Sequence, residues 1–423
     1  MDISKRTLDS GLRIITIPEA DAMAATVLVL VEAGSKYEDA SISGLSHFLE
    51  HMCFKGTTNR PRSLLISSEL DSLGAQFNAF TSHEFTGYYA KVQPKHVMQA
   101  LDIVADLYVN PLFESSEIEK EKGVIIEEIN MYEDLPHRKV AELLLELVYG
   151  DQPAGRPVSG SKEVILSATR DHFLLYRADH YVPSATVVIV AGKFDEEPVL
   201  NEISRLFSGL PQHEKKGKPS VIDTQDAPRV RIMRKQSDQT HLVLGIRSLP
   251  LLHPDRYVLE LLAGVLGGGM SSRLFERVRE QMGAAYYIRA NQDGYTDHGL
   301  FEIAAGVDHR KLSDVVGAII DEVRRIKEEF LLPEELSRAK ESILGHLYLG
   351  LEKSDEIAQF YGVQEVLSRE LKKPEDVAAG ISAVTASDIK RLAGELFTPE
   401  RANLALIGPG GDEQAFIKQL ELL

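Results

Sequence analysis

The sequence of 423 residues contains the segment Tyr181-Val-Pro-Ser-Ala-Thr-Val-Val-Ile-Val-Ala-Gly192. A second segment, Phe397-Thr-Pro-Glu-Arg-Ala-Asn-Leu-Ala-Leu-Ile-Gly408, follows at an offset of 397 − 181 = 216 positions. Both have an aromatic residue, a proline, a polar turn, an apolar run of β-strand type and a glycine. A second pair, Glu117-Ile-Glu-Lys-Glu-Lys122 and Glu335-Leu-Ser-Arg-Ala-Lys340, is offset by 335 − 117 = 218 positions. Two matches at nearly one offset predict a duplicated domain of roughly 210 residues.

The stretch between Gly209 and Arg229 has the composition of a linker. It contains Pro211 and the charged run 214–219, and Pro228 follows shortly afterwards. Proline and charged residues without apolar periodicity are typical of connecting segments. We therefore predict an N-terminal domain at 1–210, a linker at 211–228 and a C-terminal domain at 229–423.

Strands and helices are mixed within the N-terminal half. Ala25–Val31 is an apolar strand, and residues 77–92 form a hairpin around the polar break Ser82-His83-Glu84. Apolar spacing predicts helices at 101–108, 117–133 and 139–149. Because strands and helices do not alternate one by one, we expect an α+β fold. Each of the two duplicated domains should hold a largely antiparallel sheet packed with helices.

Composition excludes several classes of protein. There are 47 basic and 64 acidic residues, a formal charge of −17, which argues against nucleic acid as a partner. The single cysteine, Cys53, excludes an intrachain disulfide and a cysteine-rich metal site. The most apolar stretch, at 22–31, is too short to span a bilayer, and residues 1–13 lack the apolar core of a signal peptide. We expect a soluble, cytoplasmic protein without a membrane partner.

A metal-binding pattern stands in the segment Gly44-Leu-Ser-His47-Phe-Leu-Glu50-His51. On a helix, His47 and His51 project from one face and are spaced to bind one Zn²⁺. Glu50 lies on the flank of that face, where a carboxylate can act as a general base. The pattern is the inverted zinc-protease motif, His-x-x-Glu-His. Two histidines stacked near the core, without a metal, are the alternative that these residues leave open.

The third ligand is expected from the helix that contains residues 121–129. Glu128 shares a mostly apolar face with Val124 and Ile125, whereas Glu127 shares a polar one. A buried carboxylate must be paired or bound to a metal, which favours Glu128 and leaves Glu127 as the less favoured alternative. Glu121, two turns earlier on the same face, would orient a histidine from outside the ligand set.

These residues resemble the pitrilysin family of zinc metallopeptidases, which includes insulysin and the mitochondrial processing peptidase. Glu128 follows His51 by 128 − 51 = 77 positions, and Met52-x-Phe-Lys-Gly-Thr57 is similar to the processing-peptidase branch. The resemblance covers nearly the whole chain. It implies that His47, His51 and Glu128 bind one zinc ion per chain and that Glu50 is the base.

The resemblance extends to three further stretches. Gly74-Ala-Gln-Phe-Asn78-Ala79-Phe-Thr81 resembles the strand that pairs with the substrate backbone, although an ordinary core hairpin is the alternative. Arg279 and Tyr286 resemble a pair that binds the substrate carbonyl and the developing oxyanion; otherwise they are a surface arginine and a core tyrosine. The short run Gly267, Gly268 and Gly269 is similar to a glycine-rich loop used in substrate handling.

The second half has no His-x-x-Glu-His motif of its own. At the offset of 218, Glu128 corresponds to His346 and Glu121 to Ala339. We therefore expect a single metal site per chain, in the first half. The second half would contribute Arg279 and Tyr286.

Together with the resemblance, these features predict a zinc-dependent metalloendopeptidase that hydrolyses unfolded peptides or precursor segments. Long members of the family enclose a chamber with four such domains in one chain, and the resemblance therefore implies a closed chamber here. By the same analogy, we expect a homodimer in which each site joins the metal ligands of one subunit to Arg279 and Tyr286 of its partner. Basic peptides would be preferred if the negative charge lines the chamber. The alternative is a catalytically silent assembly or scaffold subunit of the same fold.

Overall fold

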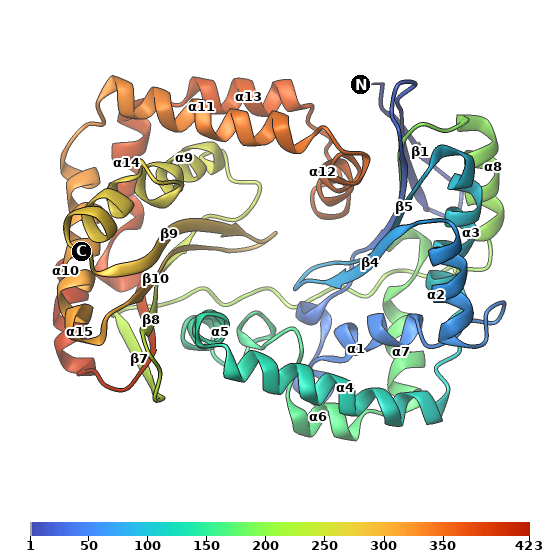
Figure 1. Cartoon of the computed structure of the whole chain (residues 1–423), viewed down its shortest axis with the longest axis horizontal. Helices are drawn as coiled ribbons and strands as arrows, with labels where there is room; N and C mark the ends of the chain where they lie inside the picture. Colours follow the sequence, from blue (N-terminus) through green and yellow to red (C-terminus); the bar gives the residue numbers. More distant parts are fainter. Residues whose placement is uncertain (1) are drawn as a thin grey trace. The chain divides into compact units, whose positions relative to one another are not determined.

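The structure is a computed structural model that describes residues 2–423 (Figure 1). Its tertiary contacts divide the chain into two compact units. Unit 1 comprises the chain up to Ile129, together with Pro157–Pro219 and Tyr348–Lys372. Unit 2 comprises Asn130–Arg156, Ser220–Leu347 and Lys373–Leu423. Each unit is built around one sheet.

The sheet of unit 1 has six strands in the order β1-β2-β6-β3-β5-β4. Neighbouring strands are antiparallel except β2 and β6, which are parallel. Strand β4 forms one edge. The central strands β3 and β6 are buried throughout because they are runs of apolar, largely β-branched residues. The strands are β1 Ser4–Thr7, β2 Arg13–Pro18, β3 Ala25–Val31, β4 Gln76–Thr81, β5 Thr86–Val92 and β6 Thr186–Gly192.

Helices cover both faces of this sheet. The larger core lies between one face and helices that include α1, α3 and α7. The other face packs against α12, which is far away in the sequence, and Gly362 of α12 allows close contact with Leu30 and Ile189. The helices are α1 Leu45–Cys53, α2 Ser63–Ser72, α3 Val97–Val109, α4 Ser115–Asp134, α6 Lys162–Ser167, α7 Arg170–His180, α8 Glu196–Leu206 and α12 Ser354–Leu367.

The sheet of unit 2 repeats the topology of unit 1 without its first strand. Its order is β7-β11-β8-β10-β9, and β7 and β11 form the parallel pair. Strands β2, β6, β3, β5 and β4 of unit 1 thus correspond in order to β7, β11, β8, β10 and β9. The predicted duplication and the largely antiparallel sheets are confirmed, and the two parallel pairs are an addition. The strands are β7 Arg229–Arg234, β8 Thr240–Ser248, β9 Ala285–Gly294, β10 Gly299–Val307 and β11 Ala402–Gly408.

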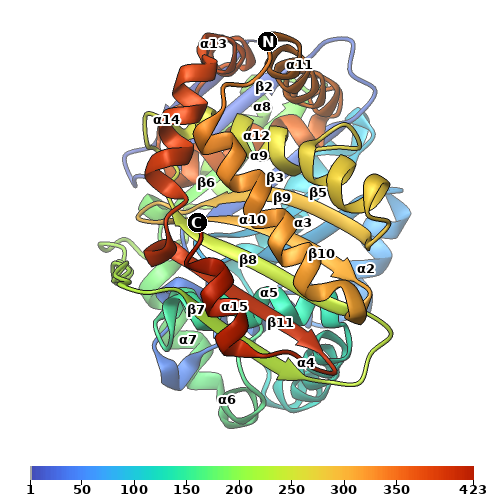
Figure 2. The same ribbon diagram turned by 90° about the vertical axis from the view of Figure 1, so that its left-hand side faces the viewer.

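Helices α10, α14 and α15, seen in Figure 2, help to cover one face of the unit 2 sheet. The other face packs against α5 through residues such as Leu143 and Leu144. A seven-residue π-helix, η6, precedes β9. The helices are α5 Pro136–Tyr149, α9 Arg256–Gly267, η6 Phe275–Gln281, α10 Leu312–Glu328, α11 Pro333–Gly350, α13 Pro374–Ala383, α14 Ala386–Leu396 and α15 Glu413–Leu420.

The two compact units do not coincide with the two halves of the sequence, because each unit contains one helix from the other half. Helix α5 belongs to the first half of the chain but packs on the sheet of unit 2, and α12 belongs to the second half but packs on that of unit 1. Residues 211–228, the expected linker, form neither helix nor strand. The boundaries 1–210 and 229–423 thus stay a prediction about the repeats. Within residues 2–423, no helix has both the length and the apolar character needed to cross a bilayer.

Candidate metal centre

Helix α1 is held at its first turn by a buried carboxylate. Gly44 precedes the helix with a φ of 95°, and a Cβ there would lie 2.6 Å from the carbonyl oxygen of Ser159. Glu38 accepts hydrogen bonds from the backbone N–H of Gly44 at 2.7 Å and of Ser46 at 2.6 Å. These bonds satisfy N–H groups that a helix start leaves without partners. The direction of α1, and of its side chains, is therefore fixed from its first residue.

The fixed helix presents two histidines side by side. Phe48, Leu49 and Met52 are buried in the core of unit 1, so the opposite flank of α1 carries His47 and His51. Their ring centroids lie 4.7 Å apart. Burial, with a smaller effect of His51, lowers the pKa of His47 to about 4, which keeps this imidazole neutral at physiological pH. A neutral imidazole is the form that binds a metal.

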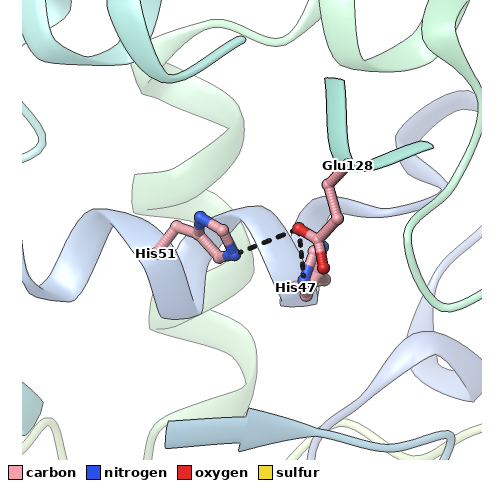
Figure 3. Close-up of side chains that lie close together, drawn as sticks. All are labelled: His47, His51 and Glu128. Carbon is pink, nitrogen blue, oxygen red and sulfur yellow. Dashed lines mark ion pairs between the residues drawn. The ribbon is translucent and has the colours of Figure 1, made fainter. Parts of the chain in front are cut away.

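Glu128 of α4 completes a three-residue cluster (Figure 3). Its Oε2 lies 3.6 Å from Nε2 of His47 and 3.6 Å from Nε2 of His51. Among the described residues, these three are the one group of at least three His, Cys, Asp or Glu with ligand atoms all within 4.8 Å of one another. Donors at about 2.0–2.2 Å from a tetrahedral zinc lie roughly 3.4 Å apart, so little movement is needed. Two imidazoles and a carboxylate fit zinc as a donor set.

Glu121, also on α4, fixes the orientation of one imidazole. Its Oε1 lies 3.0 Å from Nδ1 of His51, and its Oε2 pairs with Nζ of Lys55 at 2.6 Å. Burial would raise the pKa of Glu121, but the hydrogen bonds from His51 and Lys55 outweigh burial and lower it. The ionised carboxylate accepts the proton on Nδ1 of His51, which leaves the lone pair of Nε2 available to a metal on the side of Glu128. By contrast, Nδ1 of His47 is buried without a hydrogen-bond partner.

Glu50 links α1 to the edge strand of the sheet. Its side chain is buried, and its Oε2 accepts a hydrogen bond from the Thr81 hydroxyl at 2.6 Å. Burial raises the pKa of Glu50, against the opposing effect of that hydrogen bond. Thr81 is the last residue of β4, so the strand and the carboxylate are held together. Thr81 and Lys55 lie in stretches that carry the family resemblance, but no role was predicted for either residue. The spacing of four residues between His51 and Lys55 is the signal that could have pointed to Lys55.

The face of α4 is close to the one expected. Glu121 and Ile125 are buried and Glu128 is partly buried, while Glu127 is exposed. Val124 was expected on the inward face, and this placement is wrong because its side chain is 50% exposed. The inward stripe is therefore narrower than the sequence pattern indicated. It follows a spacing of three and four residues through 118, 121, 125 and 128.

Asn78 and Ala79 lie in β4, at the edge of the unit 1 sheet. The strand pairs with β5 on one side, with Asn78 opposite Tyr89 and Ala79 opposite Tyr88. The side-chain Oδ1 of Asn78 accepts a hydrogen bond from the backbone N–H of Ala79 at 2.9 Å. The backbone N–H of Ala79 therefore already has a hydrogen-bond partner, the side chain of Asn78.

The remaining predicted residues lie in unit 2. Arg279 is exposed on the π-helix η6, with its guanidinium 4.9 Å from the ring centre of Phe275. Tyr286, on β9, is 74% exposed, so its side chain is not part of the core. Gly267 ends α9, and Gly268 and Gly269 follow it. The last two help to line a cavity of about 90 Å³ against α11.

The His-x-x-Glu-His pattern on α1, with both histidines beside Glu128 and with Glu50 buried between them in the sequence, is that of the class with the inverted zinc-protease motif. Residues 13–162 match the family model "Insulinase (Peptidase family M16)", and residues 167–343 match "Peptidase M16 inactive domain". The chain therefore belongs to peptidase family M16, the pitrilysin family.

Similar proteins cover almost the whole chain. An uncharacterized zinc protease of Bacillus subtilis, YmxG, is 35% identical over 411 residues, which cover 97% of this chain and 99% of that protein. One from Rickettsia felis is 36% identical, with 96% of this chain and 97% of that protein covered. The crystal structure of a protease from Helicobacter pylori shares the fold with a TM-score of 0.90 at 22% identity, covering 96% of this chain and 99% of that one.

Proposed function

We propose that this chain is a zinc-dependent metalloendopeptidase that binds one Zn²⁺ per chain through His47, His51 and Glu128. The observation that carries the proposal is the convergence of both Nε2 atoms on one carboxylate oxygen of Glu128, at 3.6 Å each. The relatives named zinc proteases support the choice of metal and of reaction class. The proposed substrates are unfolded peptides or precursor segments.

Glu50 and Glu121, which lie beside the three proposed ligands, would have different roles in peptide hydrolysis. A zinc ion held there would supply Lewis-acid polarisation of a peptide carbonyl and would acidify a water molecule. Thr81 holds one carboxylate oxygen of Glu50, and the other oxygen takes a proton from water and passes it to the leaving amine. Glu121 keeps the proton of His51 on Nδ1, so that Nε2 remains a ligand atom.

Substrate binding is assigned to both units. The edge strand β4 would pair with an extended peptide, and Asn78 would then release the N–H of Ala79 to the peptide backbone. Arg279 would bind a substrate carbonyl, and Tyr286 would donate a hydrogen bond to the oxyanion that develops there. The glycines 267–269 would allow the peptide backbone to approach closely.

We further propose a cytoplasmic homodimer that encloses a chamber, in which Arg279 and Tyr286 act on substrate bound at the partner's metal ligands. Mixing tests this assembly: inactive Glu50→Gln chains and inactive Tyr286→Phe chains should regain part of the activity as heterodimers. Absence of rescue after verified subunit exchange would argue against shared sites. If acidic side chains line the chamber, added salt should slow the cleavage of basic peptides more than that of neutral ones.

The central experiment combines metal content with cleavage. The purified chain should carry about one zinc, and it should cleave a mixed peptide pool in a way that a chelator abolishes and zinc restores. Glu50→Gln is the matched control, because it should keep the zinc and lose the cleavage. Bound zinc without any cleavage would instead favour a catalytically silent member of the fold.

A further inference from the structure

Strand β9 contains an irregularity at Tyr286. In its pairing with β10, Tyr287 lies opposite Gly306, whereas Ala285 lies opposite Val307, the next residue. Tyr286 is thus an extra residue with no partner on β10. One extra residue on one strand of an antiparallel pair is a β-bulge, and bulges change the direction of a side chain.

The bulge explains why the side chain of Tyr286, although large and aromatic, is exposed and not buried in the core of unit 2. Ile288 and Ala290 of β9 are buried in the core of unit 2. In a regular strand, side chains two residues apart share a face, so Tyr286 would point into this core with them. Its side chain is instead 74% exposed. The extra residue has turned the tyrosine toward solvent.

A bridge across three strands stands next to the bulge. Gly306 of β10 is paired with Tyr287 of β9 on one side and with His241 of β8 on the other. The Tyr287 ring extends across Gly306, and its hydroxyl lies 3.0 Å from Nδ1 of His241. The two rings are stacked with centroids 6.0 Å apart. This hydrogen bond connects Tyr287, the residue after Tyr286, to β8 on the far side of β10.

Glycine at position 306 is required for this bridge. A Cβ on Gly306 would lie 2.5 Å from a ring carbon of Tyr287, well inside van der Waals contact. Burial raises the pKa of the Tyr287 phenol, and burial together with His137 lowers the pKa of His241. The phenol therefore stays protonated and the imidazole neutral at physiological pH, so the hydrogen bond persists there.

The chain before Tyr286 is fixed as well. The N–H of Ala284 donates to the carbonyl of Val278 in the π-helix at 3.0 Å. Nζ of Lys311 donates to the carbonyls of Met282 at 2.9 Å and Gly283 at 3.1 Å. Tyr286 is consequently the one unpaired residue between two anchored segments.

We propose that Tyr287, bridged to His241 over Gly306, is a positioning residue that fixes the bulge and thereby presents the hydroxyl of Tyr286 to the substrate. The inference rests on the proposed function of Tyr286 as oxyanion donor and adds the device that aims it. Tyr287 itself touches neither substrate nor metal. Its loss should therefore affect the chemical step through Tyr286 and leave substrate binding largely intact.

The test uses the full-length zinc-loaded chain, and the zinc-dependent hydrolysis of the parent and of Tyr286→Phe is measured first. Tyr287→Phe should lower kcat about three- to tenfold, the effect of one lost neutral hydrogen bond, with KM changed less than about twofold. Hydrogen exchange of the β9 amides should quicken by a similar factor, which is a readout independent of activity. Gly306→Ala should produce the same two changes with larger amplitude.

Tyr149→Phe is the matched control, because it removes a tyrosine hydroxyl bonded at 3.4 Å to the carbonyl of Gly299, at the other end of β10. It should leave kcat and the exchange of β9 unchanged. A parental kcat in both Tyr287→Phe and Gly306→Ala, when Tyr286→Phe is impaired, would overturn this inference alone. Unimpaired Tyr286→Phe would overturn the proposed role of Tyr286 and this inference together.

Discussion

Helices α1 and α4 of unit 1 and helices α9 and α11 of unit 2 occupy the same places in the repeated topology. Among the described residues, however, only the first pair brings together three side chains that could bind a metal. In unit 1, His47 and His51 face Glu128. In unit 2, Gly264 and Gly268, with the same spacing of four, line a cavity of about 90 Å³ together with His346. The place that the two imidazoles occupy in unit 1 is thus taken in unit 2 by glycines and a cavity.

This difference separates what the fold supplies from what the side chains supply. In unit 1, α1 follows β3 and faces α4; in unit 2, α9 follows β8 and faces α11. The cavity of unit 2 keeps this approach, but Ala339 replaces the orienting carboxylate of Glu121 at the offset of 218. The topology thus brings two helices together in both units, and only the imidazoles and carboxylates of unit 1 make that place a candidate metal site.

The largest effect is expected when one of the proposed ligands is removed from unit 1. We expect His51→Ala to abolish zinc retention after gel filtration, a larger effect than the about 10–100-fold loss of affinity caused by loss of an outer partner. Hydrolysis should disappear with the metal. His346→Ala, at the place of Glu128 in unit 2, should leave the zinc content unchanged. Equal losses of zinc in both variants, measured by elemental analysis, would contradict the contrast.

The next largest effect is expected at Glu50, because a general base typically contributes about 10²–10⁴-fold to rate. Glu50→Gln keeps the hydrogen-bond acceptor for Thr81 but loses the capacity to take a proton. The zinc content should stay at the parental level while kcat falls by that factor. Thr81→Val, which removes the hydroxyl at 2.6 Å, should have a smaller effect. A Glu50→Gln variant with parental kcat would show that another group is the base.

The sequence predicted the fold well because its signals are local and are repeated. The strand Ala25–Val31 has the observed bounds, and the break Ser82-His83-Glu84 lies in the hairpin turn between β4 and β5. The convergence of Glu128 on the histidines was predictable, because a carboxylate on an inward face needs a partner. The helix faces favoured Glu128 over Glu127 as the ligand, and the family resemblance implies the same assignment.

Other features depend on tertiary contacts and could not be predicted. The exchange of α5 and α12 between the units follows from which sheet face each helix covers, and no local pattern encodes that choice. The seven-residue π-helix that carries Arg279 and the one-residue bulge at Tyr286 are irregularities that the apolar spacing of the sequence does not indicate. Thr81 and Lys55 are ordinary polar residues until the fold places them beside Glu50 and Glu121.

A third prediction gives unit 1 the alanine that unit 2 has at Ala339, the position that corresponds to Glu121. Glu121→Ala removes the acceptor 3.0 Å from Nδ1 of His51, and we expect zinc affinity to fall about 10–100-fold in chelator competition. It also leaves Lys55 without its partner at 2.6 Å. The double variant Lys55→Met/Glu121→Ala separates the two effects and should bind zinc as weakly as Glu121→Ala alone. Recovery of parental affinity in the double variant would assign the loss to Lys55.

The smallest expected effect concerns stability, where the two units should respond to pH in opposite directions. In unit 1, burial lowers the pKa of His180 from 6.5 to about 4, so the unfolded chain binds the proton first and stability falls as pH drops from 6.5 to 4. In unit 2, burial, with the charge of Asp293, raises the pKa of Glu302 from 4.5 to about 8. The folded chain therefore holds this proton, and the stability it contributes below pH 4.5 is lost as pH rises toward 8. Urea unfolding at several pH values measures how the free energy of unfolding changes with pH in both ranges.

His180→Gln should remove the loss of stability between pH 6.5 and 4 only, and Glu302→Gln should remove the loss between pH 4.5 and 8 only. The same change in both variants would show that the pH dependence is not divided between the units in this way.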